Sequence, residues 1–111
     1  LLGAANLRDI GYHFPDNDAK YKNIDSKILL KRTYELVREN GYVLGNIDSV
    51  ISLQKQKIKD FIPEMQKTLA EVLGVDQSQV SIKATTTEGL GFEGREEGIS
   101  AQSVALIYKA E

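Results

Sequence analysis

The sequence predicts an α/β (α+β) sandwich, in which helices pack on one face of a sheet. Two segments, 25–40 and 60–73, repeat apolar residues at helical spacing. Three others, 45–53, 80–85 and 99–108, are short alternating or continuous apolar runs of the kind that form strands. The predicted order is therefore helix, strand, helix, strand, glycine-rich loop, strand. With 111 residues, the chain has room for one small domain and not for two.

The first helix is expected to run from Asp25 or Ser26 to about Asn40. Either of the first two side chains can accept a hydrogen bond from the backbone at a helix start. Gly41 stands where a helix commonly stops. The apolar face of this helix is formed by Leu29, Thr33, Leu36 and Val37.

The second helix has the clearest pattern in the chain. Asp60 is a plausible N-cap, and Pro63 falls in the first turn, where its missing N–H costs nothing. Gly74 ends the helix. The residues at the spacing of three and four are Phe61, Ile62, Met65, Leu69, Val72 and Leu73.

The predicted strands differ in their patterning. In the first, Ile47, Ile51 and Leu53 share a face with Ser49. The second alternates apolar and polar residues over 80–85. The last is apolar on both faces, so we expect it to be buried on both sides. Residues 6–24 are rich in turn-forming residues and are expected to be an irregular loop.

Composition excludes several classes of function. The 14 basic and 16 acidic residues give a net charge of −2 and are interspersed, which disfavours a nucleic-acid partner. No apolar run is long enough to span a bilayer. The chain has no cysteine, so disulfides and thiolate zinc sites are excluded. These features suit a cytoplasmic protein without a membrane or nucleic-acid partner.

A threonine run at the end of the second strand is the first candidate site. Thr85, Thr86 and Thr87 offer hydroxyl and main-chain donors that can hold phosphate oxygens. Glu88 follows and can bind a hard divalent cation that bridges such oxygens. Threonines are also good strand residues, and this run alone fits that plainer role as well.

The glycine-rich segment 89–98 is the second candidate. Its glycines would let the backbone approach a ligand closely, and Arg95 can clamp an anion. The spacing matches neither a P-loop nor a dinucleotide fingerprint. A mobile turn that carries a solvated charge cluster is the alternative.

The third candidate lies in the polar loop near the N-terminus. Asp9 and Asp16, with Gly11 and Phe14 close by in sequence, can hold the hydroxyls of a polyol. The commoner use of aspartate in such a loop is capping and turn formation. His13 is the only histidine and cannot make a zinc site alone, so we expect a structural or surface role.

Lys57 lies between the first strand and the second helix. A phosphate contact at this position is possible, and an ordinary solvated lysine is equally compatible with the sequence.

Taken together and in order, these segments resemble the 2-C-methyl-D-erythritol 2,4-cyclodiphosphate synthase family over essentially the whole chain, residues 1–111. The run KATTTE followed by GFEGREEG is highly specific to it. The resemblance rests on Leu1-Leu2-Gly3-Ala4-Ala5, Asp9-Ile10-Gly11, Phe14-Pro15-Asp16, Asp25-Ser26, Gly41-Tyr42, Asn46-Ile47-Asp48, Lys83-Ala84-Thr85-Thr86-Thr87-Glu88 and Gly91-Phe92-Glu93-Gly94-Arg95-Glu96-Glu97-Gly98-Ile99.

The resemblance implies a ferredoxin-like or chorismate-mutase-like subunit of a homotrimer, with active sites between subunits. The implied enzyme is a metal-dependent phosphorus–oxygen lyase of the non-mevalonate isoprenoid pathway. It cyclises 4-diphosphocytidyl-2-C-methyl-D-erythritol 2-phosphate and releases CMP. The alternative is a non-catalytic α/β ligand-binding or regulatory module with an anion site.

The resemblance also assigns roles to residues. Glu88 would bind Mg²⁺ or Mn²⁺, and Thr86 would act with it in catalysis. Thr85, Thr86 and Lys57 would hold the cytidyl diphosphate. The methylerythritol part would be held by Asp9, Gly11, Phe14 and Asp16, while Arg95, also a candidate for substrate binding, and Glu97 would lie at a cavity on the trimer axis.

Some features depart from the family pattern. The chain starts at Leu1 without an initiator Met, and we expect an N-terminal part of the domain to be missing. The resemblance places the zinc ligands, one Asp and two His, upstream of this point, and His13 matches none of them. Arg8 and Gln56 stand where the family often has Gly and Pro.

Overall fold

The computed structural model describes residues 1–54 and 57–111. Its three strands form one sheet in the order β2-β1-β3. In chain order the elements are α1 (Ile10–His13), the 3₁₀ turn η1 (Ala19–Tyr21), α2 (Ser26–Glu39), β1 (Tyr42–Ser52), the 3₁₀ turn η2 (Lys59–Phe61), α3 (Ile62–Leu73), the 3₁₀ turn η3 (Gln77–Gln79), β2 (Val80–Thr85), α4 (Gly91–Gly94) and β3 (Ser100–Lys109).

The sheet is mixed, with β1 in the centre. Strand β1 runs parallel to β2, with Ser52 opposite Thr85 at the end of the ladder. It runs antiparallel to β3, and the register shifts between Leu44 and Asn46. A Cβ atom on Gly45 would lie 2.5 Å from the Tyr108 ring, so the glycine makes room for that ring at the irregularity.

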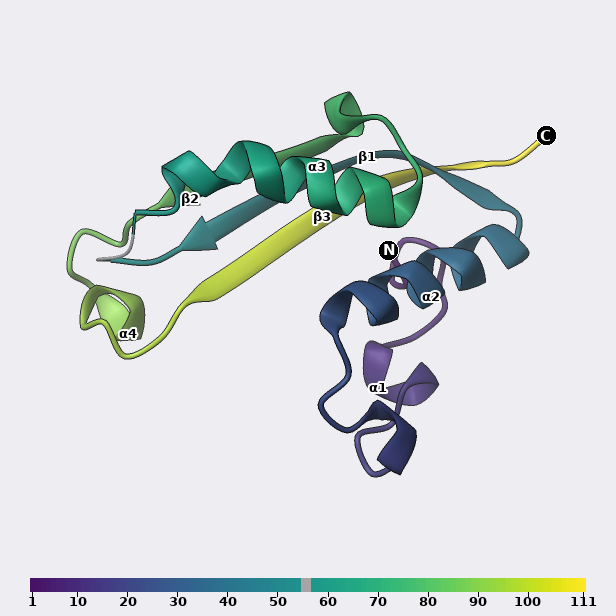
Figure 1. Cartoon of the computed structure of the whole chain (residues 1–111), viewed down its shortest axis with the longest axis horizontal. Helices are drawn as coiled ribbons and strands as arrows, with labels where there is room; N and C mark the ends of the chain where they lie inside the picture. The colour runs from purple at the N-terminus through teal and green to yellow at the C-terminus, as the bar shows by residue number, and fades with distance from the viewer. Residues whose placement is uncertain (55–56) are drawn as a thin grey trace.

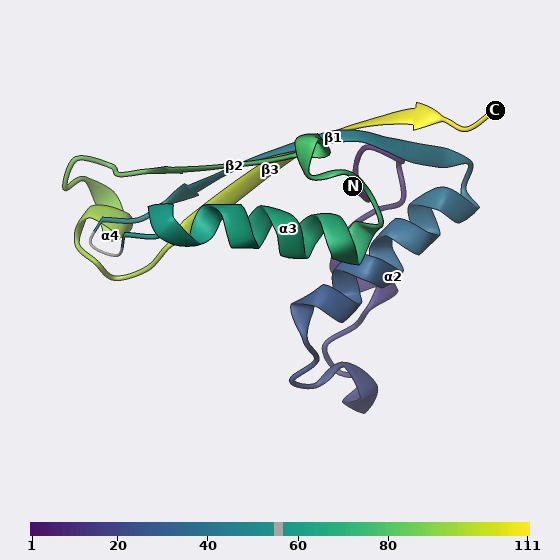
Figure 2. The same ribbon diagram turned by 45° about the horizontal axis from the view of Figure 1, so that its top comes forward.

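Helices α2 and α3 lie on the same side of the sheet, as predicted, and leave the other side open (Figures 1 and 2). One core cluster joins α2, β1 and the N-terminal turn around Val37, which is fully buried. A second cluster joins α3 to β2 around Val80. Burial of these apolar side chains is the main force that holds the layers together.

Local sequence signals set the ends of α2 as predicted. The Asp25 side chain accepts a hydrogen bond of 2.9 Å from the Lys27 amide. This backbone hydrogen bond lowers the pKa of Asp25 below its usual value. Gly41 follows the helix with a φ of 90°, a conformation that favours glycine.

The start of α3 differs from the prediction. Asp60 does not cap it, because Asp60 lies inside the 3₁₀ turn η2, and the cap position falls on Phe61 without a side-chain bond. Pro63 is in the first turn, and Gly74 ends the helix with a left-handed φ of 69°, as expected.

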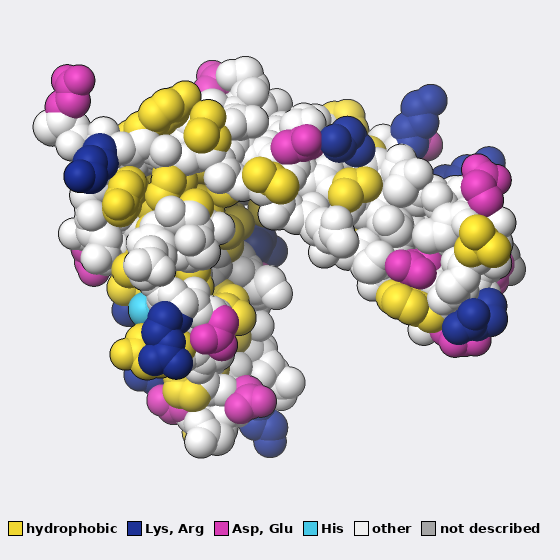
Figure 3. All heavy atoms as spheres, turned by 180° about the vertical axis from the view of Figure 1, so that it is seen from behind, with side chains coloured by type: hydrophobic (Ala, Val, Ile, Leu, Met, Phe, Trp, Pro, Cys, Tyr) yellow, Lys and Arg dark blue, Asp and Glu magenta, His cyan; other side chains and the backbone are white. Residues whose placement is uncertain are grey.

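Strands β1 and β3 correct two further expectations. Strand β1 begins at Tyr42, earlier than predicted. Strand β3 is not buried on both sides, because helices cover only one face of the sheet. On the open face Val104, Leu106 and Tyr108 are 74%, 50% and 55% exposed. Figure 3, seen from behind, shows hydrophobic side chains along this face.

The segments predicted to be loops contain short turns. Residues 6–24 are mainly irregular but include α1 and η1. The glycine-rich segment contains the single helical turn α4. No helix in the described part of the chain is long and apolar enough to cross a membrane.

Candidate functional site

The threonine run lies where β2 leaves the sheet. Thr85 is the last residue of the strand, and its carbonyl accepts a hydrogen bond of 3.0 Å from the Leu53 amide. Thr85 and Thr86 are exposed. Within the described part of the chain, their hydroxyls make long, local bonds of 3.3 Å, to the Thr86 carbonyl and from the Glu88 amide. Both hydroxyls can therefore exchange these bonds for a ligand at small cost.

Glu88 is held in an unusual backbone conformation. Its φ is 56°, in the left-handed region that non-glycine residues rarely adopt. The carboxylate is exposed and has no hydrogen bond or ion pair among the described residues. A strained residue with a free carboxylate is typical of a functional position.

The glycines of this loop are needed for close packing. A Cβ atom on Gly94 would lie 2.1 Å from the Gly89 carbonyl carbon, which no side chain could tolerate. The Gly89 amide donates to the Gln54 side chain at 3.2 Å. The Thr87 hydroxyl donates to the Leu90 carbonyl. These contacts hold the Glu88 loop in the conformation that the structure shows.

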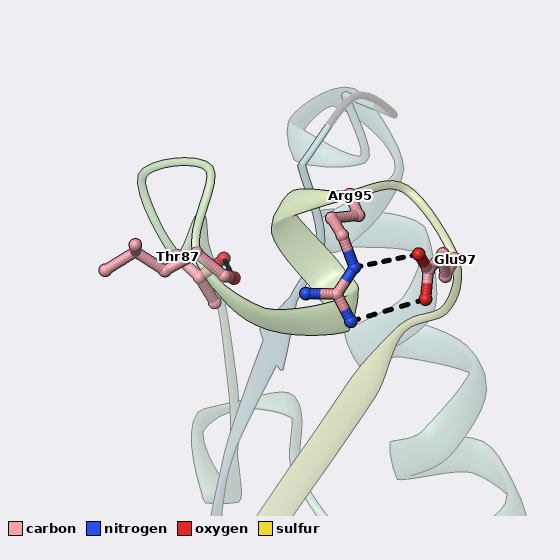
Figure 4. A network of polar contacts seen from close by, with 4 residues as sticks. Thr87, Arg95 and Glu97 are labelled. Atoms are coloured by element: carbon pink, nitrogen blue, oxygen red, sulfur yellow. Dashed lines mark hydrogen bonds and ion pairs between the residues drawn. The ribbon is translucent and has the colours of Figure 1, made fainter.

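Arg95 and Glu97 form a bidentate pair at the end of this loop. The guanidinium Nε donates to Oε1 at 2.8 Å and an Nη donates to Oε2 at 3.4 Å. Figure 4 shows the two side chains pointing toward one another. More than half of each side chain is exposed, so the pair is open to solvent in a single subunit.

The polyol candidates lie around α1. Asp9 precedes this helix without capping it, and its carboxylate has no partner among the described residues. Asp16 is likewise exposed and without a described partner. Asp18, by contrast, caps η1 through the Lys20 amide. Capping thus applies to Asp18 and not to Asp9, while Asp16 lies in the turn that the hydrogen bond from the Asp18 amide to the Pro15 carbonyl closes.

Gly11 lies against the Asp9 carboxylate. A Cβ atom at this position would be 3.3 Å from Asp9 Oδ2. Phe14 is half-buried and packs edge-on against Tyr21, with ring centroids 5.5 Å apart. Arg8 has a φ of 72°, a backbone conformation that glycine adopts more readily.

Sequence reasoning missed one contact in this loop. The His13 Nε2 lies 2.5 Å from the Leu7 carbonyl oxygen, six residues earlier in the chain. No spacing rule signals such a contact, because the loop between the two residues has no regular period.

The structure brings the predicted residues together in two groups and not in one. Thr85, Thr86, Glu88, Arg95 and Glu97 lie at the α4 end of the sheet, while the α1 loop lies at the opposite end of the molecule (Figure 1). Lys57 is exposed and is the first described residue after Gln54. The Gln54 side chain accepts the hydrogen bond from the Gly89 amide, next to Glu88. Gln56 lies outside the described residues.

An open cavity of about 820 Å³ lies beside the α1 loop, between the two long helices and the sheet. Its wall is mostly apolar and includes Asp9 and Arg8. The hydroxyls of Ser49 and Ser103 also line it and hydrogen-bond to one another at 2.6 Å.

The possible metal ligands among the described residues lie apart from one another. Within residues 1–54 and 57–111, no three His, Asp, Glu or Cys side chains come together to hold an ion. A single carboxylate such as that of Glu88 cannot complete the shell of a hard divalent cation, so other oxygen ligands would have to supply the rest. The described residues do not fit a zinc site by themselves.

Sequence comparison gives one consistent result. The YgbB family matches residues 1–108. The 2-C-methyl-D-erythritol 2,4-cyclodiphosphate synthase of Bacteroides fragilis is 65% identical over 109 residues, which are 98% of this chain and 69% of the relative. The synthase of Porphyromonas gingivalis is 64% identical over 110 residues, 99% of this chain and 68% of the relative.

Solved structures agree in fold. The bifunctional IspDF from Campylobacter jejuni has a TM-score of 0.93 at 47% identity, over 97% of this chain and 29% of that one. The Plasmodium falciparum IspF in complex with CDP has a TM-score of 0.85 at 32% identity, over 99% of this chain and 65% of that one. The chain belongs to the YgbB family, that of the 2-C-methyl-D-erythritol 2,4-cyclodiphosphate synthases.

Proposed function

We propose that this chain supplies active-site residues of a 2-C-methyl-D-erythritol 2,4-cyclodiphosphate synthase and that neighbouring subunits share each site. The enzyme is a lyase that cyclises 4-diphosphocytidyl-2-C-methyl-D-erythritol 2-phosphate and releases CMP, in isoprenoid biosynthesis. The named relatives do not favour the binding-module alternative.

In this reaction an oxygen of the 2-phosphate attacks the β-phosphorus. One P–O bond forms, the bond from the β-phosphorus to the bridging oxygen breaks, and CMP leaves with that oxygen. The protein has little covalent chemistry to perform, so its contribution is alignment and charge stabilisation.

The Glu88 loop would bind the diphosphate. The exposed hydroxyls of Thr85 and Thr86 can donate to phosphate oxygens, and the Lys57 ammonium can approach them from the neighbouring loop. The free Glu88 carboxylate would hold the bridging Mg²⁺ or Mn²⁺. When bound, this cation would neutralise charge that develops on the phosphate oxygens. The CDP complex of the Plasmodium falciparum relative supports a cytidyl diphosphate ligand.

The α1 loop would bind the methylerythritol part. The unpartnered carboxylates of Asp9 and Asp16 can accept hydrogen bonds from its hydroxyls. Gly11 leaves room beside Asp9. The half-buried Phe14 ring would support the loop through Tyr21.

The separation of these two groups within one chain carries the shared-site proposal. No single subunit can present both to one small substrate (Figure 1). A homotrimer in which the α1 loop of one subunit meets the Glu88 loop of the next would complete each site. The open sheet face would be buried between subunits, and Arg95 and Glu97 would lie at the trimer axis.

Two further parts of the proposal concern a metal ion and the cellular compartment. Zn²⁺ would be held by side chains that are not among the described residues. The compartment would be the cytoplasm.

The test is CMP release from the cytidyl diphosphate substrate by the full-length protein, with Mg²⁺ and with a chelator. We expect release that the chelator abolishes. An intact, zinc-loaded trimer that releases no CMP would overturn the enzyme assignment and favour a binding module.

A further inference from the structure

We infer that His13 is a positioning residue that holds the α1 loop in the shape needed to bind the polyol part of the substrate. The inference rests on the proposed function of that loop. It concerns residues 7–13, with Leu7 and His13 at the two ends and Asp9 and Gly11 between them.

The closing contact is a single hydrogen bond. The His13 Nε2 lies 2.5 Å from the Leu7 carbonyl oxygen. A carbonyl can only accept, so Nε2 must carry the hydrogen. Both residues are half-buried, and water therefore competes less for this bond than for one at the open surface.

The loop has few other means of keeping its shape. Helix α1 has four residues and no side-chain cap, and a helix of one turn is not stable by itself. Arg8 occupies the left-handed region at a φ of 72°, which is unfavourable for a non-glycine residue. Its guanidinium lies 4.0 Å from the centre of the Tyr12 ring.

The His13 ring lies against Tyr12 in the loop and faces helix α2 across a cavity. Tyr12 packs edge-on against it with a centroid distance of 5.0 Å. A small cavity of about 180 Å³ lies between His13 and helix α2. The charged residues of α2 that line this cavity are Arg32, Glu35 and Glu39.

The consequence for binding is specific. Among residues 1–54 and 57–111, Asp9 has no partner that fixes its carboxylate, so the position of the carboxylate depends on the backbone that the His13–Leu7 bond closes. Loss of the bond should weaken contacts to the polyol and leave the nucleotide contacts at the other end of the molecule unchanged.

The matched pair of variants is His13→Leu and His13→Gln. Leucine keeps the apolar volume and removes the donor. Glutamine places an amide N–H at about the same distance from the backbone as Nε2. Lys22→Leu is the control, because this exposed position near the loop leaves the hydrogen bond in place, and it should bind the substrate and CDP as the wild type does.

We expect His13→Leu to raise KM for the full substrate about tenfold, the equivalent of one lost hydrogen bond, with kcat changed less. CDP, which lacks the polyol, should bind with wild-type affinity. His13→Gln should recover most of the loss. An unchanged KM, an equal loss of CDP affinity or a failure of rescue by glutamine would overturn the inference.

Amide hydrogen exchange tests the loop without relying on activity. Amides of residues 8–14 should exchange faster in His13→Leu than in the wild type, while those of β1 and α3 should not change. Unchanged exchange in the loop would refute its closure by His13. A wild-type protein that releases no CMP would instead refute the proposed function.

Discussion

Gly94 lies directly on the backbone of Gly89: a Cβ atom at position 94 would be 2.1 Å from the carbonyl carbon and 2.5 Å from the carbonyl oxygen. This contact closes the loop whose first residue, Glu88, has the free carboxylate and a φ of 56°. The geometry of the loop therefore depends on the absence of a side chain at position 94, which packs on Gly89.

The first prediction is that Gly94→Ala displaces the Glu88 loop. A shift of about 1 Å in a group that aligns substrate costs on the order of 100-fold in rate, and we expect a loss of kcat/KM of that size. Gly3→Ala is the matched control, since a Cβ there meets nothing within 4 Å. Steady-state CMP release measures both, and equal activity of the two variants would contradict the prediction.

The second prediction concerns the charge of Glu88. Glu88→Gln keeps the size of the side chain but removes the negative charge that a divalent cation requires. Metal-dependent CMP release should be abolished while the trimer stays intact in size-exclusion chromatography. Glu71→Gln, at an exposed position on α3, is the control and should be fully active. Activity retained by Glu88→Gln would remove Glu88 from the mechanism.

A third prediction separates stability from binding at the α1 loop. In Gly11→Ala the new methyl group would be 3.3 Å from Asp9 Oδ2, so the carboxylate must move by a few tenths of an ångström. We expect KM to rise by at most about tenfold, the cost of one hydrogen bond to a charged group. The melting temperature should not fall, because alanine is the better helix former. A lower melting temperature with an unchanged KM would show that Gly11 serves the fold alone.

Helix ends and glycine turns could be predicted because their signals are local. Asp25, Gly41, Pro63 and Gly74 act through hydrogen bonds and φ angles within a few residues, and the structure confirms all four. The prediction that Asp60 caps α3 was wrong, because Asp60 lies inside the 3₁₀ turn η2 and the helix starts after that turn.

What the sequence could not predict depends on contacts between distant parts. The apolar pattern of β3 was read as burial on both sides, but a pattern does not say whether the second face is covered within the chain or left open. The bond from His13 to Leu7 depends on the path of an irregular loop. For the site, the sequence indicated candidate residues whose roles stay predictions. The resemblance implied active sites between subunits, and within one chain the α1 and α4 loops lie apart (Figure 1).

The fourth prediction tests the open sheet face. Val104 is 74% exposed in the single chain and would be buried in the proposed trimer. Val104→Glu would place an unpaired charge in that interface. The free-energy cost of burying this charge should prevent the trimer from forming. We expect a folded, inactive monomer by light scattering. Ile28→Glu, at an exposed apolar position on α2, should remain trimeric. A Val104→Glu trimer with normal activity would show that this face is not the interface.

The last prediction follows from the pKa of Asp25. The Lys27 amide donates to its carboxylate and lowers the pKa, so the folded state holds a proton on Asp25 more weakly than the unfolded state. The stabilisation is therefore present above the ordinary pKa of an aspartate and is lost as pH falls through the lower, folded value. Asp25→Asn keeps an oxygen that can accept the bond but does not titrate. Its melting temperature should fall less than that of the wild type between about pH 6 and pH 3, across the range in which aspartates titrate.

Two comparisons complete this experiment. Asp25→Ala removes the capping oxygen and should melt at a lower temperature than Asp25→Asn at every pH. Asp60→Asn, where the side chain has no partner among the described residues, should follow the wild-type profile. If Asp25→Asn also follows the wild-type profile in acid, the Asp25 cap does not contribute to the acid sensitivity of the fold, and the remaining loss must come from other carboxylates such as the capping Asp76, whose pKa is lowered by the Ser78 amide.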